Sequence, residues 1–229
     1  MPARSRPVHW RGLTLIELLV ALALLSVLAL LSWRTLDGMT RAQQVTQEHA
    51  NRWRGWQTAL AQWDADLDAL LDTEQVPPLD YDGRVLRLTR SDPDQGLGGG
   101  LRVIAWGLQP DPVSGTLRWA RWASAPLQRT EALEQAWLQA EQWGRNPSVQ
   151  DRQQQVLLTQ VADWQLFYHR GGAWSNPQSA EGQNEAQDSA ARASLPDGIR
   201  LLLTLPGTGN PTGQLVRDWL RLSQGGEGQ

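Results

Sequence analysis

The chain of 229 residues contains no cysteine and no lysine. Without cysteine it cannot form a disulfide, so the hydrophobic core alone has to stabilise the fold. The formal net charge is −3, the wrong sign for a general nucleic-acid binder. The aromatic residues are thirteen tryptophans, two tyrosines and one phenylalanine. Because a buried indole needs a partner for its N–H group, several tryptophans are expected at the edge of the core or at contacts between subunits.

Acidic residues are also absent from the first twelve positions, which contain three arginines and precede a long apolar run. Between Leu13 and Ser32 the only charged residue is Glu17, and about 20 helical residues match the thickness of a bilayer core. Segments rich in arginine stay in the cytoplasm, so the part of the chain that follows the apolar run is predicted to lie on the outer side of the membrane. A secretory signal peptide or a plain signal anchor explains this pattern except for Glu17, whose carboxylate costs roughly a few kcal/mol at membrane depth.

The helix of the apolar run is predicted to continue beyond the membrane. No proline occurs between Pro7 and Pro77, so the helix is expected to extend from residue 13 to about residue 71, with Gly38 and Gly55 as soft points. Apolar residues recur there at spacings of three and four, which is typical of one stripe of an amphipathic helix. The members of this stripe are Val45, His49, Trp53, Trp56, Leu60, Trp63, Leu67 and Leu70. Its tryptophans are assigned to the core, with contacts to partner helices as the alternative.

After residue 77 the pattern changes to short strands separated by turn residues. Strands are predicted at residues 84–89, 101–108, 116–123, 156–159, 163–169, 199–205 and 215–222, and one further helix at 131–143. Residues 176–194 lack apolar periodicity and are expected to form a mobile loop, and the tail 225–229 is expected to fray. A long helix packed on an antiparallel sheet is an α+β architecture.

Catalytic motifs are missing. The chain has no GxSxG, no HExxH and no phosphate-binding glycine loop, so no enzymatic activity and no cofactor are predicted. A membrane-tethered periplasmic enzyme remains the alternative function from a different class of protein.

Two acidic segments are candidates for a calcium site. The first contains Asp64, Asp66, Asp68 and Asp72. Three of these aspartates share one helix face and Asp66 points elsewhere, so the segment is interpreted as a solvated face. Helical spacing supplies few converging oxygen ligands. The second segment, Asp92-x-Asp94-x-Gly96, is half of a calcium loop without the distal glutamate. No metal site is therefore assigned.

The junction Arg11-Gly12-Leu13, with Glu17 four residues further on, closely resembles the signal of type IV prepilins. In that family a prepilin peptidase cuts after the glycine and the new N-terminus is methylated. A glutamate at the fifth mature position pairs with the N-terminal amine of a neighbouring subunit. The resemblance implies cleavage between Gly12 and Leu13, N-methylation of Leu13 in place of the usual phenylalanine, and an assembly role for the Glu17 carboxylate.

The resemblance also implies the pilin fold, in four parts. Residues 1–12 would be the leader peptide, and 13–33 the transmembrane half of the helix. Residues 34–76 would be its periplasmic amphipathic half, and 77–229 a β-rich periplasmic headgroup. Loss of the three leader arginines would change the formal charge from −3 to −6.

Later segments are similar, in the same order, to the J-class minor pseudopilins of type II secretion. They are residues 33–38, 60–71, 101–108, 116–122 and 166–168, then Trp174 and residues 195–203. The resemblance implies a subunit of the pseudopilus tip in the bacterial inner membrane. It would assemble with I-class and K-class minor pseudopilins and start polymerisation of the major pseudopilin, for export of folded proteins. A minor pilin of a type IV pilus, for adhesion, motility or DNA uptake, is the alternative. Such chains often carry a C-terminal disulfide, which this chain cannot form.

Overall fold

The computed structural model describes residues 14–73, 76–92, 100–178, 195–207 and 213–221. The chain forms two compact units, Met1–Asn51 and Arg52–Gln229, and helix α1 (Leu15–Asp68) extends through both. The predicted loop at 176–194 is described only as far as residue 178, and the tail 225–229 lies outside the described residues.

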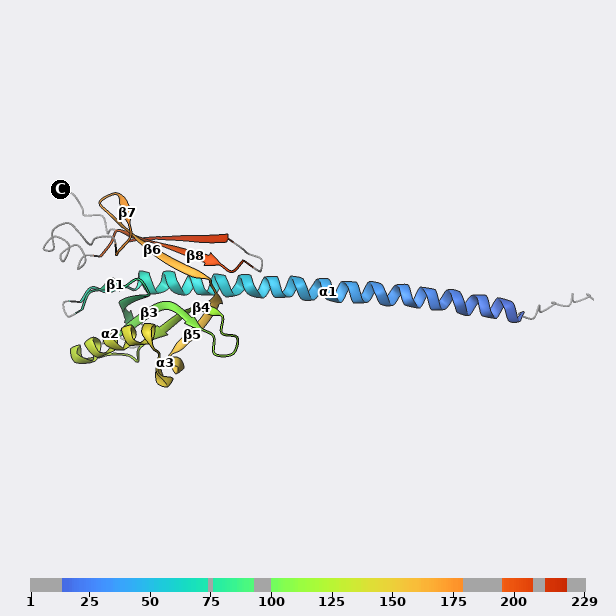
Figure 1. Ribbon diagram of the computed structural model, residues 1–229, viewed down its shortest axis with the longest axis horizontal. Helices are drawn as coiled ribbons and strands as arrows, with labels where there is room; N and C mark the ends of the chain where they lie inside the picture. Colours follow the sequence, from blue (N-terminus) through green and yellow to red (C-terminus); the bar gives the residue numbers. More distant parts are fainter. Residues whose placement is uncertain (1–13, 74–75, 93–99, 179–194, 208–212, 222–229) are drawn as a thin grey trace, which may run out of the picture. The chain divides into compact units, whose positions relative to one another are not determined.

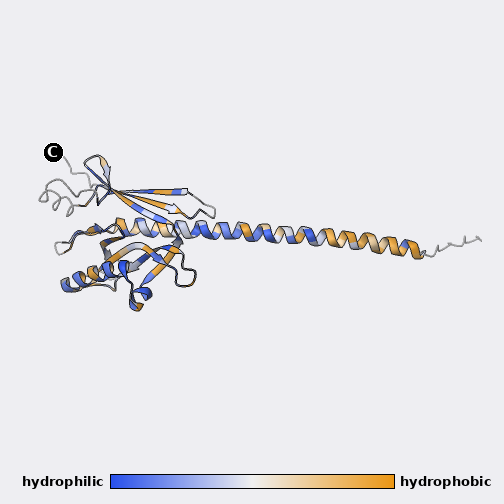
Figure 2. Ribbon diagram, viewed as in Figure 1, coloured by the Kyte–Doolittle hydropathy of each residue, from blue (hydrophilic) through white to orange (hydrophobic). Residues whose placement is uncertain are grey.

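The described part of the first unit consists of α1 (Figure 1). Its N-terminal end is the most hydrophobic part of the helix, with an 18-residue window of mean hydropathy 2.6 (Figure 2). None of that window is buried, and by length and composition this helix is apolar enough to cross a membrane. The helix continues without a break through Gly38 and Gly55. The long helix predicted from periodicity is therefore confirmed, with its C-terminal end three residues earlier than expected.

The second unit contains two antiparallel sheets. The first sheet consists, in spatial order, of β1 (Leu79–Tyr81), β2 (Val85–Asp92), β3 (Gly100–Pro110), β4 (Leu117–Ala123) and β5 (Gln155–Gln160). The second sheet has the order β7 (Ala173–Ser175), β6 (Asp163–Arg170), β8 (Gly198–Leu205) and β9 (Gly213–Leu220). Helices α2 (Thr130–Arg145) and α3 (Val149–Gln153) connect β4 to β5.

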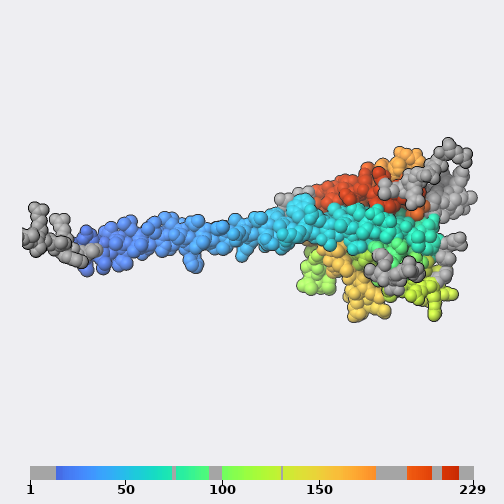
Figure 3. Space-filling view, turned by 180° about the vertical axis from the view of Figure 1, so that it is seen from behind, coloured from blue at the N-terminus to red at the C-terminus, as the bar shows by residue number. Residues whose placement is uncertain are grey.

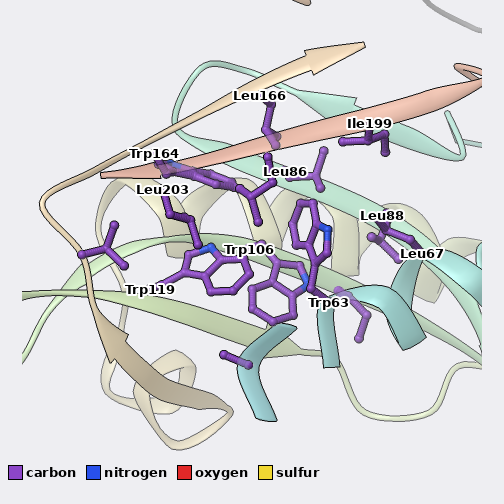
Figure 4. Close-up of a cluster of buried hydrophobic side chains, with 14 of the residues drawn as sticks. Trp63, Leu67, Leu86, Leu88, Trp106, Trp119, Trp164, Leu166, Ile199 and Leu203 are labelled. Atoms are coloured by element: carbon purple, nitrogen blue, oxygen red, sulfur yellow. The ribbon is translucent and has the colours of Figure 1, made fainter. Parts of the chain in front are cut away.

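The larger core lies where the C-terminal part of α1 packs between the two sheets (Figure 1). Trp63 of α1 contacts Trp106 of β3 and Trp119 of β4, with ring centroids 5.4 and 5.5 Å away (Figure 4). Leucines and isoleucines of both sheets surround these rings, among them Leu86, Leu88, Leu166, Ile199 and Leu203. Because an aromatic ring buries a large apolar area, this tryptophan cluster contributes much of the hydrophobic stabilisation of the unit.

A second core lies on the other face of the first sheet, which α2 covers. The buried residues of α2 recur at helical spacing and include Leu133, Ala136, Ala140 and Trp143. They face small and β-branched side chains of the sheet, such as Val103. Strand β4 therefore places Trp119 in the larger core and Trp122 in this one, as the alternation of its sequence predicts.

Each predicted strand and the predicted second helix correspond to an observed element, while β1, β7 and α3 were not predicted. The α+β, pilin-like layout is confirmed, with two sheets on the helix. Trp33 is exposed, and Trp53 is 49% exposed, so the assignment of Trp53 to the core is wrong. Trp63, Trp106, Trp119, Trp122 and Trp143 are fully buried. These tryptophans are more deeply buried than expected from the need of each indole N–H for a hydrogen-bond partner. The Nε1 atoms of Trp63, Trp119 and Trp122 have no hydrogen-bond partner among the described residues.

Candidate functional site on the N-terminal helix

The first turn of α1 is closed by a pair of reciprocal hydrogen bonds. The Glu17 carboxylate accepts from the Thr14 backbone N–H at 3.1 Å and from the Thr14 hydroxyl at 3.0 Å. The Thr14 hydroxyl oxygen in turn accepts from the Glu17 N–H at 3.3 Å. This is the geometry of a capping box, which the T-x-x-E spacing in the sequence already signals. Glu17 is exposed, so its carboxylate remains accessible to a second chain. Gly12 and Leu13 lie outside the described residues.

The apolar side chains of α1 in the first unit have no cover within the described chain. Leu15 to Leu31 are exposed wherever the residue is large and hydrophobic, and Trp33, Leu36, Met39 and Val45 are exposed as well. Such a continuous apolar surface is normally covered by lipid or by another protein. The stripe divides accordingly, because Trp56, Trp63 and Leu67 lie in the core of the second unit.

The interpretation of the first acidic segment as a solvated face is wrong for Asp66. Its side chain has no solvent exposure. It accepts hydrogen bonds from Arg121 Nε and Nη2 at 2.6 and 2.8 Å, from Arg90 Nη1 at 2.6 Å, and from Trp106 Nε1 at 2.9 Å. Gln62 Nε2 adds a fifth bond at 3.1 Å. Two partly buried guanidinium groups and two further N–H donors thus compensate the cost of burying the carboxylate.

Asp68 is exposed and Asp64 is partly exposed, as a solvated face requires, but both side chains also bind the second sheet. Asp64 pairs with Arg217 of β9, whose Nε lies 3.2 Å from Oδ1. These hydrogen bonds and the opposite charge raise the pKa of Arg217. Asp68 Oδ1 accepts from Trp219 Nε1 at 2.8 Å. Of the four aspartates, Asp68 and Asp72 are exposed as predicted, and Asp64 is partly exposed.

The described residues contain no group of three or more His, Cys, Asp or Glu side chains that could hold a metal ion. In the second acidic segment, Asp92 is buried and forms an ion pair with Arg102, at 2.7 Å from Oδ2 to Nε. Asp94 and Gly96 lie outside the described residues. The half calcium loop therefore has its first carboxylate engaged by an arginine.

Two known families match the chain. Residues 11–33 match the prokaryotic N-terminal methylation motif, and residues 34–216 match the type II secretion system (T2SS), protein J. Among curated proteins, none gives a significant match. The methylation motif, the long apolar helix and the antiparallel sheets define a pilin-like protein.

The chain belongs to the family of protein J of the type II secretion system. It is accordingly a minor pseudopilin, a structural component of the secretion apparatus that assembles with other pseudopilins. Its N-terminal motif fits processing by a prepilin peptidase. The described residues contain one helix apolar enough to cross a membrane, near the N-terminus, which is compatible with anchoring in the inner membrane. The match favours secretion over the alternative of a type IV pilus.

Proposed function

We propose that the protein is a subunit of the pseudopilus tip. Together with I-class and K-class minor pseudopilins, it initiates polymerisation of the major pseudopilin. Residues 1–12 form a cytoplasmic leader, 13–33 cross the inner membrane, and 34–76 and 77–229 form the periplasmic part of the helix and the headgroup. The observation that carries this proposal is that the methylation motif continues directly into the protein J match along one helix.

The first part of the proposal is cleavage between Gly12 and Leu13, followed by methylation of Leu13. A peptidase has to approach the backbone of this junction closely, and glycine leaves room for it. Gly12→Phe should therefore leave only precursor in membrane fractions, as measured by intact mass. Val8→Phe, an equally bulky change four residues upstream, should be processed normally. Mature protein of normal mass from Gly12→Phe would contradict the assignment.

The second part assigns an assembly role to Glu17. In the single chain the carboxylate is bound only by Thr14 at its own helix start. We expect it to pair with the N-terminal amine of a neighbouring subunit, because a carboxylate near membrane depth is stable only when neutralised. Glu17→Leu should then insert into the membrane and be cleaved, yet lose assembly, since the peptidase recognises mainly the Gly12 junction.

Thr14→Val is the matched control for that variant, because it removes the cap and keeps the carboxylate. Both are compared in a strain that lacks the native gene, by crosslinking to the I-class and K-class pseudopilins and by secretion of a reporter exoprotein. Thr14→Val should retain crosslinking and secretion, and Glu17→Leu should lose them. The loss caused by Glu17→Leu should be milder than that of the same change in the major pseudopilin, because a tip subunit has fewer neighbours. Normal crosslinking and secretion with Glu17→Leu would remove Glu17 from the mechanism.

Placement at the tip is tested by copurification. The region from residue 34 onward, which includes the whole second unit, is expressed with the periplasmic regions of the I-class and K-class proteins. A complex that contains all three chains is expected. Binding to the major pseudopilin alone would place the chain elsewhere in the fibre and overturn the tip assignment.

A further inference from the structure

Strand β9 is an edge strand of a kind that folded proteins usually avoid. It pairs with β8 at all eight of its residues, without a register shift. The other edges of the two described sheets are shorter or irregular. β1 and β7 have three residues each, and the pairing of β5 shifts register opposite Trp119 and Ala120. β9 also contains no proline. Short length, bulges and proline are the usual protections of a sheet edge, and β9 has none of them.

One hydrogen bond fixes which backbone groups of β9 point outward. The Arg221 N–H donates to the Asp197 carbonyl at 2.9 Å, so this pair is hydrogen-bonded directly. Hydrogen-bonded pairs alternate along an antiparallel ladder, and the register continues as Ile199 with Trp219 and Leu201 with Arg217. The residues between them therefore direct their N–H and C=O groups away from β8. These residues are Gln214, Val216, Asp218 and Leu220.

The charges of β9 do not guard this edge, because each is engaged inside the unit. Arg217 pairs with Asp64 of α1. Asp218 accepts from Arg200 Nε and Nη2 at 2.7 and 2.6 Å, which lowers the pKa of the Asp218 carboxyl. On either side of these two charges, Val216 and Leu220 are 55% and 62% exposed. The strand forms part of the surface drawn in red beside α1 (Figure 3). A partner therefore meets apolar side chains at every fourth position and no unpaired charge.

We propose that the outer edge of β9 pairs with an extended strand of a neighbouring pseudopilin, which adds a fifth strand to the second sheet. Main-chain hydrogen bonds to residues 214–220 supply the affinity, and apolar side chains opposite Val216 and Leu220 supply the register. The partner is a pseudopilin because members of this family assemble with such chains. The inference thus rests on the proposed place of the protein in a pseudopilin complex.

The test uses a photo-crosslinking amino acid in the full chain, in cells that contain the other pseudopilins. Placed at Asp218 it should give an adduct with another pseudopilin. Placed at Val113, an exposed residue of the turn between β3 and β4, it should not give that adduct. Val216→Pro removes one outward N–H and leaves the β8 pairing intact, so it should lower the yield of the Asp218 adduct about tenfold. Val216→Thr keeps the N–H and the β-branched shape and should retain the adduct.

Leu220→Lys provides a second way to block the edge if Val216→Pro fails to accumulate, since an edge lysine opposes strand pairing without altering the core. A further crosslinker at Gln43 on α1 separates the two proposals. A Gln43 adduct with a pseudopilin but no Asp218 adduct would overturn the edge pairing alone, and no adduct at either position would overturn the proposed complex as well. An Asp218 adduct with a second copy of this chain or with an exported protein would also overturn the inference. So would an adduct that persists in both blocking variants.

Discussion

Replacement of Asp66 by asparagine should destabilise the second unit by about 3–5 kcal/mol, the usual effect of removing one partner from a buried ion pair. Asparagine keeps the size of the side chain and one acceptor oxygen, but it loses the charge and the second acceptor. The guanidinium groups of Arg90 and Arg121 are only 15% and 16% exposed, so water cannot fully replace the carboxylate. Since folded domains are stable by about 5–15 kcal/mol, the loss is a large fraction of the total.

The matched control is Asp64→Asn, because Asp64 lies on the same helix but pairs with a more exposed arginine. Asp64 pairs with Arg217, which is 48% exposed, and an ion pair of this kind contributes about 0–1 kcal/mol. Both variants are compared with the native sequence in the region from residue 34 onward, by urea unfolding followed through tryptophan fluorescence. With a slope of about 2 kcal/mol/M, Asp66→Asn should lower the midpoint by roughly 1.5–2.5 M and Asp64→Asn by at most about 0.5 M. Equal shifts, or a loss below about 1 kcal/mol for Asp66→Asn, would refute the reasoning.

Three further outcomes are expected. Burial raises the pKa of Tyr81 to about 12, and burial also raises the pKa of Tyr168 far above the ordinary value near 10. Because folding favours the protonated phenols, this stabilisation is complete below about pH 10 and is lost as the pH rises through the folded pKa values. Phenolate absorbance should therefore appear near pH 12 in the folded protein and near pH 10 in urea. Gly144→Ala should destabilise by about 1–3 kcal/mol, since the added Cβ would lie 1.8 Å from Val85 Cγ2. Gly55→Ala, with nothing within 4 Å, should stabilise by up to about 1 kcal/mol, and thermal melting distinguishes the two. Finally, a reductant should not change the unfolding midpoint, because the chain has no cysteine. Calcium should not change it either, whereas a calcium-dependent rise reversed by chelator would restore the acidic loop as a ligand site.

Periodicity predicted α1 well because its signal extends over more than fifty residues. The strands were found for the same reason on a smaller scale, since alternation over six or more residues is recognisable. Strands β1 and β7 have three residues each and α3 has five. Segments of this length contain too few positions to display a period, and their structure depends on the neighbours to which they bind.

The burial of Asp66 could not be predicted from the local sequence pattern. Helical spacing places Asp66 beside the apolar stripe, but its burial depends on ion pairs with Arg90 and Arg121, which are 24 and 55 residues away in the sequence. The division of the strands into two sheets has the same origin, because long-range pairing decides it. Glu17 is the opposite case. Its position relative to Gly12 identified the candidate site from sequence. The cap with Thr14 was not predicted, although the T-x-x-E spacing is a signal that could have shown it.

The row of aspartates on the last turns of α1 has a mechanical consequence. Asp66 joins the helix to β2 and β4 of the first sheet through Arg90 and Arg121. Asp64 and Asp68 join it to β9 of the second sheet. A load applied along the axis of this helical segment acts on both sets of bonds at once, in shear, so they have to break together rather than one after another. Both sheets of the second unit therefore share the force that this helical segment transmits.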